Sequence, residues 1–157
     1  MVTRRTVLWF CVFVVLGAGS ARAAAPLQSF ETSNLTIVGA DGRHRFTVEL
    51  AETPAQLEQG LMFRPSLAAD AGMLFDFKQP TVATMWMRNT LIPLDMLFVD
   101  RDGTIVGIAA RAVPGSDAII AAPAPVRAVI ELNGGTAARL GIRPGDRVLH
   151  PLFGRGR

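Results

Sequence analysis

Six residues carry the side-chain groups best suited to binding or chemistry in this chain. Trp86, Arg88 and Asn89 stand in one short segment, and Arg64, Asp95 and Glu131 lie outside it. An indole, a guanidinium, an amide and nearby carboxylates in a largely aliphatic chain are typical of a binding surface or of a polar network inside a small core. The sequence holds no Gly-x-Ser-x-Gly elbow, Ser-x-x-Lys or phosphate-binding glycine loop, which favours binding over catalysis.

The two carboxylates stand among apolar neighbours. Asp95 precedes four apolar residues, and Glu131 lies between Ile130 and Leu132. A buried carboxylate needs a cation or several N–H donors. We therefore expect one polar cluster that either fixes the fold or binds a small polar ligand beside the indole, and its members are Arg64, Arg88, Asn89, Asp95 and Glu131, with Trp86 as an apolar wall.

Three other functions stay open from the residues alone. Asp95 and Glu131 could form the acid–base pair of a small hydrolase or lyase. Met85 and Met87 alternate on one strand face and could bind Cu(I) through their thioethers, although the same spacing predicts core methionines. Residues 134–148 resemble the late segment of peptide-binding PDZ domains, but the carboxylate-binding loop that such a domain needs is absent upstream. No cofactor is expected.

The elements that must position these residues are short. Polar and apolar residues alternate over 43–50, which predicts a strand with one solvated face. Thr53, Pro54 and Gln56 have the spacing of a helix start with a capping box, and Gly60 would end that helix. The pattern predicts a mainly β, single compact sandwich or barrel-like domain with two short helices, the second at 135–140, and with further strands at 73–77, 82–88, 95–99, 104–110, 126–132 and 147–150.

Residues 1–23 have the order of a secretory signal peptide: two arginines, an apolar run and small residues before a cleavage site. The adjacent Arg4 and Arg5 fit either a twin-arginine or a general secretory signal. We expect export to the periplasm, with membrane contact only through this segment if it is not cleaved. A leader and first strand over 24–41, a β domain over 42–151 and a tail over 152–157 would follow.

Removal of residues 1–23 changes the charge and the thiol content. The chain has 16 basic and 13 acidic residues, and the signal segment holds three of the arginines and no acid, so 13 of each remain. A neutral chain lacks the electrostatic signature of a nucleic-acid binder. Cys11, the single cysteine, would also be lost, which excludes disulfides and thiol chemistry. The expected partner is a small polar ligand or another protein.

Several segments together resemble a known family. They are Gly60-Leu61-Met62-Phe63-Arg64, Gly72-Met73-Leu74-Phe75-Asp76-Phe77, Met85-Trp86-Met87-Arg88-Asn89-Thr90 running into Ile92-Pro93-Leu94-Asp95, and Val129-Ile130-Glu131-Leu132 with the glycines after it. In this order they resemble the DUF192 (UPF0127) family of small, often exported, prokaryotic proteins, over roughly residues 42–151. The resemblance implies a compact, mainly β fold and no established biochemical activity. Arg88 stands where the family often has Lys.

Overall fold

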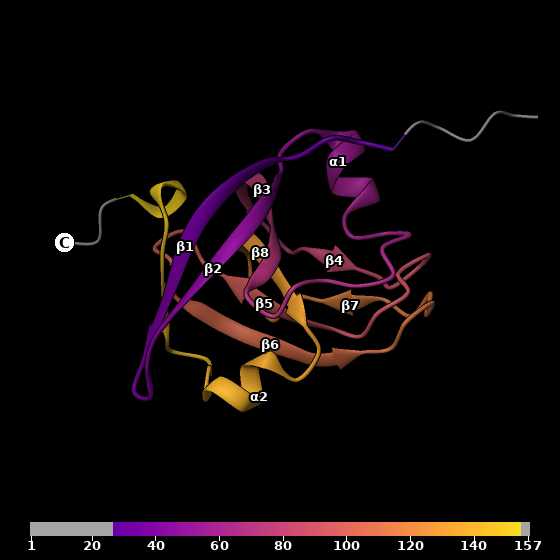
Figure 1. Cartoon of the computed structure of the whole chain (residues 1–157). Coiled ribbons are helices and arrows are strands. Elements are labelled where there is room, and N and C mark those ends of the chain that lie inside the picture. The colour runs from indigo at the N-terminus through magenta and orange to yellow at the C-terminus, as the bar shows by residue number, and fades with distance from the viewer. Residues whose placement is uncertain (1–26, 155–157) are drawn as a thin grey trace, which may run out of the picture.

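The computed structural model describes residues 27–154, and the signal segment expected at 1–23 lies outside them. Nearly all of this part of the chain is built from strands and three short helical segments (Figure 1). In chain order they are β1 (Glu31–Gly39), β2 (Gly42–Ala51), α1 (Pro54–Gln59), β3 (Ala71–Thr81), β4 (Thr84–Met85), β5 (Leu94–Val99), β6 (Ile105–Ala112), β7 (Ile120–Ala121), β8 (Val126–Asn133), α2 (Thr136–Leu140), β9 (Arg147–Leu149) and the 3-10 turn η1 (Pro151–Phe153). The predicted mainly β class with two short helices is confirmed.

Seven strands form one curled sheet in the order β6-β5-β8-β3-β2-β1-β9, and β4 and β7 form a small second sheet. All neighbours in the large sheet are antiparallel except β2 and β3, which are parallel and joined through α1. The sheet curls far enough for its two edges to meet. A bridge links Thr104 to Arg147, and the Val148 amide donates to the Gly103 carbonyl at 2.7 Å. Because an isolated bridge and turn contacts join the edges here, and not a continuous ladder, the curled sheet is a half-barrel.

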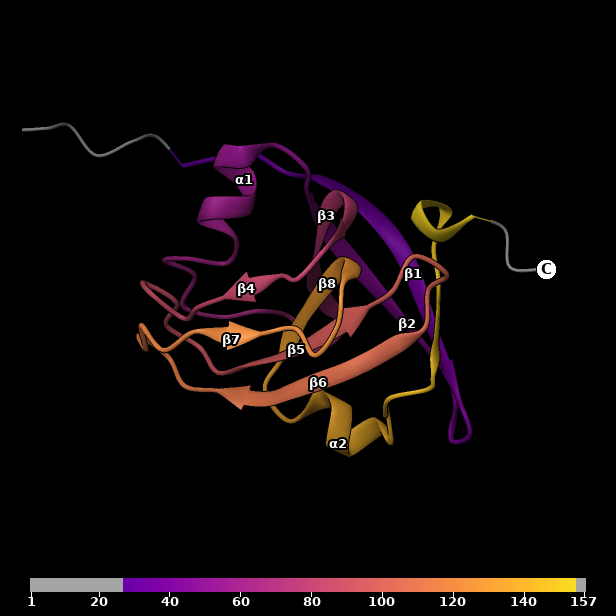
Figure 2. The ribbon, with the colours of Figure 1, turned by 180° about the vertical axis from the view of Figure 1, so that it is seen from behind.

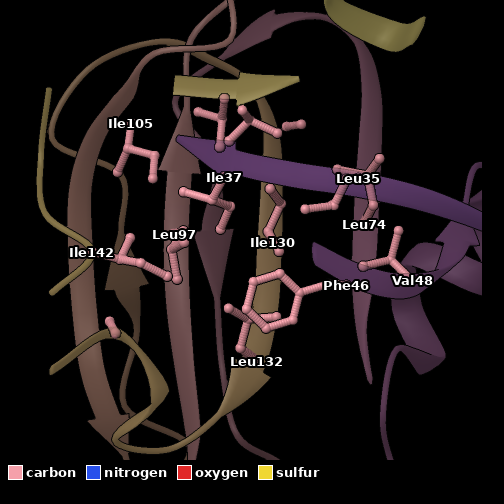
Figure 3. Close-up of a cluster of buried hydrophobic side chains, with 14 residues drawn as sticks. Leu35, Ile37, Phe46, Val48, Leu74, Leu97, Ile105, Ile130, Leu132 and Ile142 are labelled. Carbon is pink, nitrogen blue, oxygen red and sulfur yellow. The ribbon is translucent and has the colours of Figure 1, made fainter. Parts of the chain in front are cut away.

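One face of the curled sheet encloses the first hydrophobic core (Figure 3). Side chains alternate across a strand, so every second residue of β3, β5 and β8 points into this core. Leu74, Leu97 and Ile130 are fully buried there, each from a different central strand. Ala137 of α2 and Ile142 also pack against this core.

The opposite face of the same strands carries a second core. Met73, Met96 and Val129 are fully buried on it. The small sheet of β4 and β7 and the chain that follows α1 pack against this core, through side chains such as Met85, Ile120 and Leu61. Both views place α1 on the same side of the molecule as β4 and β7, well away from α2 (Figures 1 and 2). The candidate site lies on this second face.

The predicted helix start is confirmed in detail. Thr53 accepts a hydrogen bond from the Gln56 amide at 3.3 Å, and the Gln56 side-chain oxygen accepts one from the Thr53 amide at 3.1 Å. One expectation differs from the structure. The strand predicted at 82–88 is limited to β4, because the chain then turns through Asn89, whose φ is +56°. The first strand begins at Glu31, within the segment over 24–41 that was expected to hold a leader and the first strand, and it pairs with β2 along its whole length. Among residues 27–154, no helix is long and apolar enough to cross a membrane.

Candidate functional site

Asp95 and Glu131 lie on opposite faces of the large sheet. In the pairing of β5 with β8, Asp95 is opposite Leu132 and Met96 is opposite Glu131. Directly paired residues share a face, so Asp95 points with Leu132 toward the first core and Glu131 points with Met96 toward the second. The acid–base pair that the sequence left open is therefore wrong, because the sheet separates the two carboxylates.

Asp95 is fully buried, but its partners are backbone amides and not the basic side chains that the sequence suggested. One carboxylate oxygen accepts from the Arg111 amide at 2.8 Å and the Gly135 amide at 2.9 Å, and the other accepts from the Ala137 amide at 2.8 Å. These bonds fix the turn into α2 and hold Arg111 at a φ of +51°. Asp95 therefore organises the backbone on the face away from the candidate site.

The predicted basic members of the cluster have other partners. Arg64 forms a two-bond ion pair with Glu49, both bonds at 2.5 Å. Arg88 pairs with Asp117 at 2.6 Å, and both side chains are exposed. The Asn89 amide nitrogen lies 3.8 Å from the sulfur of Met62. The single polar cluster expected from the sequence is thus wrong, because each predicted cation is already paired to a different acid.

Glu131 lines a concave pocket that we call the Glu131 pocket. Its volume is about 260 Å³. It lies between the chain of residues 57–62, the middle of β3 and the β4 segment, and its walls are mostly apolar. The lining residues are Leu57, Glu58, Gln59, Gly60, Leu61, Met62, Phe75, Phe77, Thr84, Met85, Trp86, Thr90 and Glu131.

The Glu131 side chain is only 4% exposed, and it has no hydrogen-bond or ion-pair partner among residues 27–154. Its cross-strand neighbours, Met73 and Met96, are both fully buried and offer no polar group of their own. This burial raises the pKa of Glu131 to about 8. At neutral pH the group is therefore mainly an uncharged carboxylic acid that can both donate and accept a hydrogen bond.

Trp86 joins this pocket to a second hollow. It is 42% exposed, and the guanidinium of Arg88 lies 5.0 Å from the centre of its ring, within the range of a cation–π contact. The second hollow, of about 500 Å³, is lined by Trp86, Arg88 and Asn89 together with residues of α1 and Leu27. Four of the six predicted site residues thus line the two neighbouring hollows, and Arg64 and Asp95 line neither.

Sequence reasoning missed most of the pocket wall. Phe75 and Phe77 alternate on β3, and that alternation signalled a shared face but not a pocket. Met62 lines both hollows, but in the sequence the Gly60-Leu61-Met62 segment indicated only the helix end and the family resemblance. Met85 and Met87, the pair considered for Cu(I), lie in different environments. Met87 is fully buried in the second core, whereas Met85 lines the pocket. Within residues 27–154, no three His, Cys, Asp or Glu side chains are grouped so that they could hold a metal.

The family model DUF192, described as an uncharacterized group, matches residues 36–150. The chain belongs to the DUF192 family. No curated protein matches it. Two solved structures resemble this DUF192 domain closely. One, from Sinorhizobium meliloti 1021, is described only as a candidate transcription regulator; it is 50% identical, with 79% of this chain and 97% of that chain covered at a TM-score of 0.76. The other, a protein of unknown function from Novosphingobium aromaticivorans DSM 12444, is 47% identical, with 84% and 94% covered at a TM-score of 0.77.

Proposed function

We propose that this DUF192 protein is an exported module that binds one small organic ligand in the Glu131 pocket. The observation that carries the proposal is the Glu131 side chain, which is buried at the pocket wall without a partner among the described residues. A ligand that donates to this carboxyl group or accepts from it would gain a hydrogen bond in a largely desolvated site, which is worth about 1 kcal/mol.

The shape and chemistry of the walls support a small ligand. Ligand sites are concave and mostly apolar, with a few polar groups that fix orientation. Here Phe75, Phe77 and Trp86 supply apolar area, and Thr90 and Glu131 are the polar groups that are themselves buried. Export is supported by the signal-peptide order of residues 1–23 and is part of the same proposal.

Three probes of nearly equal shape test the proposal: 3,3-dimethylbutan-1-ol, which is neutral, choline, which is cationic, and 3,3-dimethylbutanoate, which is anionic. Each is titrated into the uniformly ¹⁵N-labelled protein, and backbone amide shifts are followed. We expect at least one probe to give saturable shifts at Gly60, Leu61 and Thr90, which line the pocket. The amides of Ile37 and Phe46, in the first core, should stay unchanged.

The proposal fails if none of the three probes gives a saturable shift. It also fails if the shifts map to the first core or to the α2 side of the molecule, because the pocket would then not be the binding site.

A further inference from the structure

The ionisable residues that line the Glu131 pocket are all acidic. Glu58 and Glu131 both line it, whereas no arginine, lysine or histidine does. Arg88 is the cation beside the shared wall, and it already pairs with Asp117 at 2.6 Å and lies over the Trp86 ring. Arg64 is likewise held by Glu49. The described residues therefore provide no positive charge to face the buried carboxyl group.

The remaining walls suit a positive charge. Phe75, Phe77 and Trp86 present aromatic rings to the pocket, and Met62 and Met85 present thioethers. Aromatic faces attract cations, with about 0.5–2 kcal/mol for each well-placed contact. Thioethers are polarisable and adapt to ligands of irregular shape. Carboxyl groups, aromatic rings and thioethers without a resident cation form the environment in which organic ammonium groups are bound.

We propose that the ligand of the Glu131 pocket is an organic cation, an amine or ammonium compound with a small apolar body, whose positive charge faces Glu131. This inference rests on the proposed function and narrows it to one ligand class. The apolar body would lie against Phe75, Phe77 and Trp86. The exposed carboxylate of Glu58 would add a weaker attraction at the entrance.

Binding of such a cation should displace a proton. Because burial holds the pKa of Glu131 near 8, the empty pocket carries a neutral carboxyl group below that pH. A bound cation favours the carboxylate, so the proton leaves as the cation enters. The strands on either side present Met73 and Met96, and Glu58 is the other ionisable group of the pocket, so Glu131 is the group that titrates with binding.

The same three probes, which keep one shape and differ in charge, provide the test. Dissociation constants are measured near pH 9 and near pH 6 for the wild type, Glu131→Gln and the matched variant Glu58→Gln. We expect choline to bind about tenfold more tightly than 3,3-dimethylbutan-1-ol near pH 9. This preference should shrink near pH 6 and in Glu131→Gln, where the aromatic faces alone still attract the cation, and it should persist largely in Glu58→Gln. Calorimetry near pH 7 in buffers of different ionisation enthalpy should report proton release on choline binding.

The two proposals fail in different ways. If the neutral or the anionic probe binds as tightly as choline, with shifts at the pocket, the organic-cation class is wrong and small-molecule binding stands. If no probe binds, the proposed function itself is wrong. The pH dependence and proton release use the unmodified protein, so the test does not depend on whether Glu131→Gln folds. A choline preference that is the same near pH 6 and pH 9 would overturn the role of Glu131.

Discussion

At the scale of single residues, Glu131 should make the stability of the fold depend on pH. Its pKa is raised from 4.5 to about 8 by burial, so between these values the native state holds a proton that the unfolded chain releases. The free energy of unfolding should therefore be highest below about pH 4.5 for this group and fall as pH rises toward about 8, by up to about 1.4 kcal/mol per pH unit.

Urea unfolding of the wild type and Glu131→Gln near pH 5, 7 and 9 measures this dependence. The glutamine cannot ionise, so the variant should lose the decline and become the more stable protein near pH 9. Glu31→Gln, which removes an exposed carboxylate at the start of β1, is the matched control and should keep the wild-type profile. Parallel profiles for Glu131→Gln and the wild type would show that Glu131 is not buried in the manner described.

Asp95 should behave as a structural residue. In Asp95→Asn, the amide oxygen can still accept from the Arg111 and Gly135 amides, but the new NH₂ group meets the Ala137 amide, donor against donor. We expect a loss of roughly 2–3 kcal/mol in unfolding free energy by urea titration. Hydrogen exchange at Ala137 should accelerate. Since the sheet separates Asp95 from the pocket, probe affinity should stay unchanged, and a large loss of affinity would contradict this separation.

The sequence was sufficient to predict that both carboxylates are buried, because each stands among apolar residues on a strand. It was not sufficient to predict their partners. Those depend on the register of β5 against β8, where an offset of one residue decides which face each side chain takes. The partners of Asp95 are backbone amides of residues between 111 and 137. Every residue except proline has such an amide, so the residue types in the sequence do not show which ones bind Asp95.

At the scale of elements, the sequence predicted the helices and strands that have a clear local residue pattern, and it did not predict those that lack one. The capping box of α1 follows from residue spacing, and β2 follows from the alternation over 43–50. Two-residue strands such as β7 have too few residues to show a period, and their pairing with β4 is a tertiary contact. The pocket wall was missed for the same reason, since it joins three separate elements.

The capping box of α1 supports that wall and can be tested. Thr53→Ala removes the acceptor for the Gln56 amide while Thr53→Ser retains it. We expect Thr53→Ala to lower the unfolding free energy by about 1 kcal/mol, and Thr53→Ser to cost much less. Because Leu57, Glu58 and Gln59 of α1 line the pocket, choline affinity should also weaken in Thr53→Ala. Equal behaviour of the two variants in urea titrations would exclude a role for the cap.

At the scale of the whole molecule, closure of the curled sheet depends on the turn before β6 lying tightly against β9. A side-chain carbon added at Gly103 would lie 2.7 Å from the Val148 carbonyl oxygen, and the φ of Gly103 is +85°. Gly115 also has a positive φ, +70°, but a carbon added there meets nothing within 4 Å. Comparing alanine variants at these two positions therefore distinguishes the cost of backbone strain, which both share, from the cost of disturbing the contact between the turn and β9, which occurs only at Gly103.

Gly115→Ala should cost about 1–2 kcal/mol in urea unfolding, which is the backbone strain alone. Gly103→Ala carries a comparable strain and, in addition, forces β9 away from the turn, so we expect a loss larger by roughly 2 kcal/mol. Amide exchange of Val148, which donates to the Gly103 carbonyl, should accelerate in Gly103→Ala alone. If the two variants lose equal stability and Val148 stays protected, the edges of the sheet do not need this contact, and the first core must be held by the seven strands without closure.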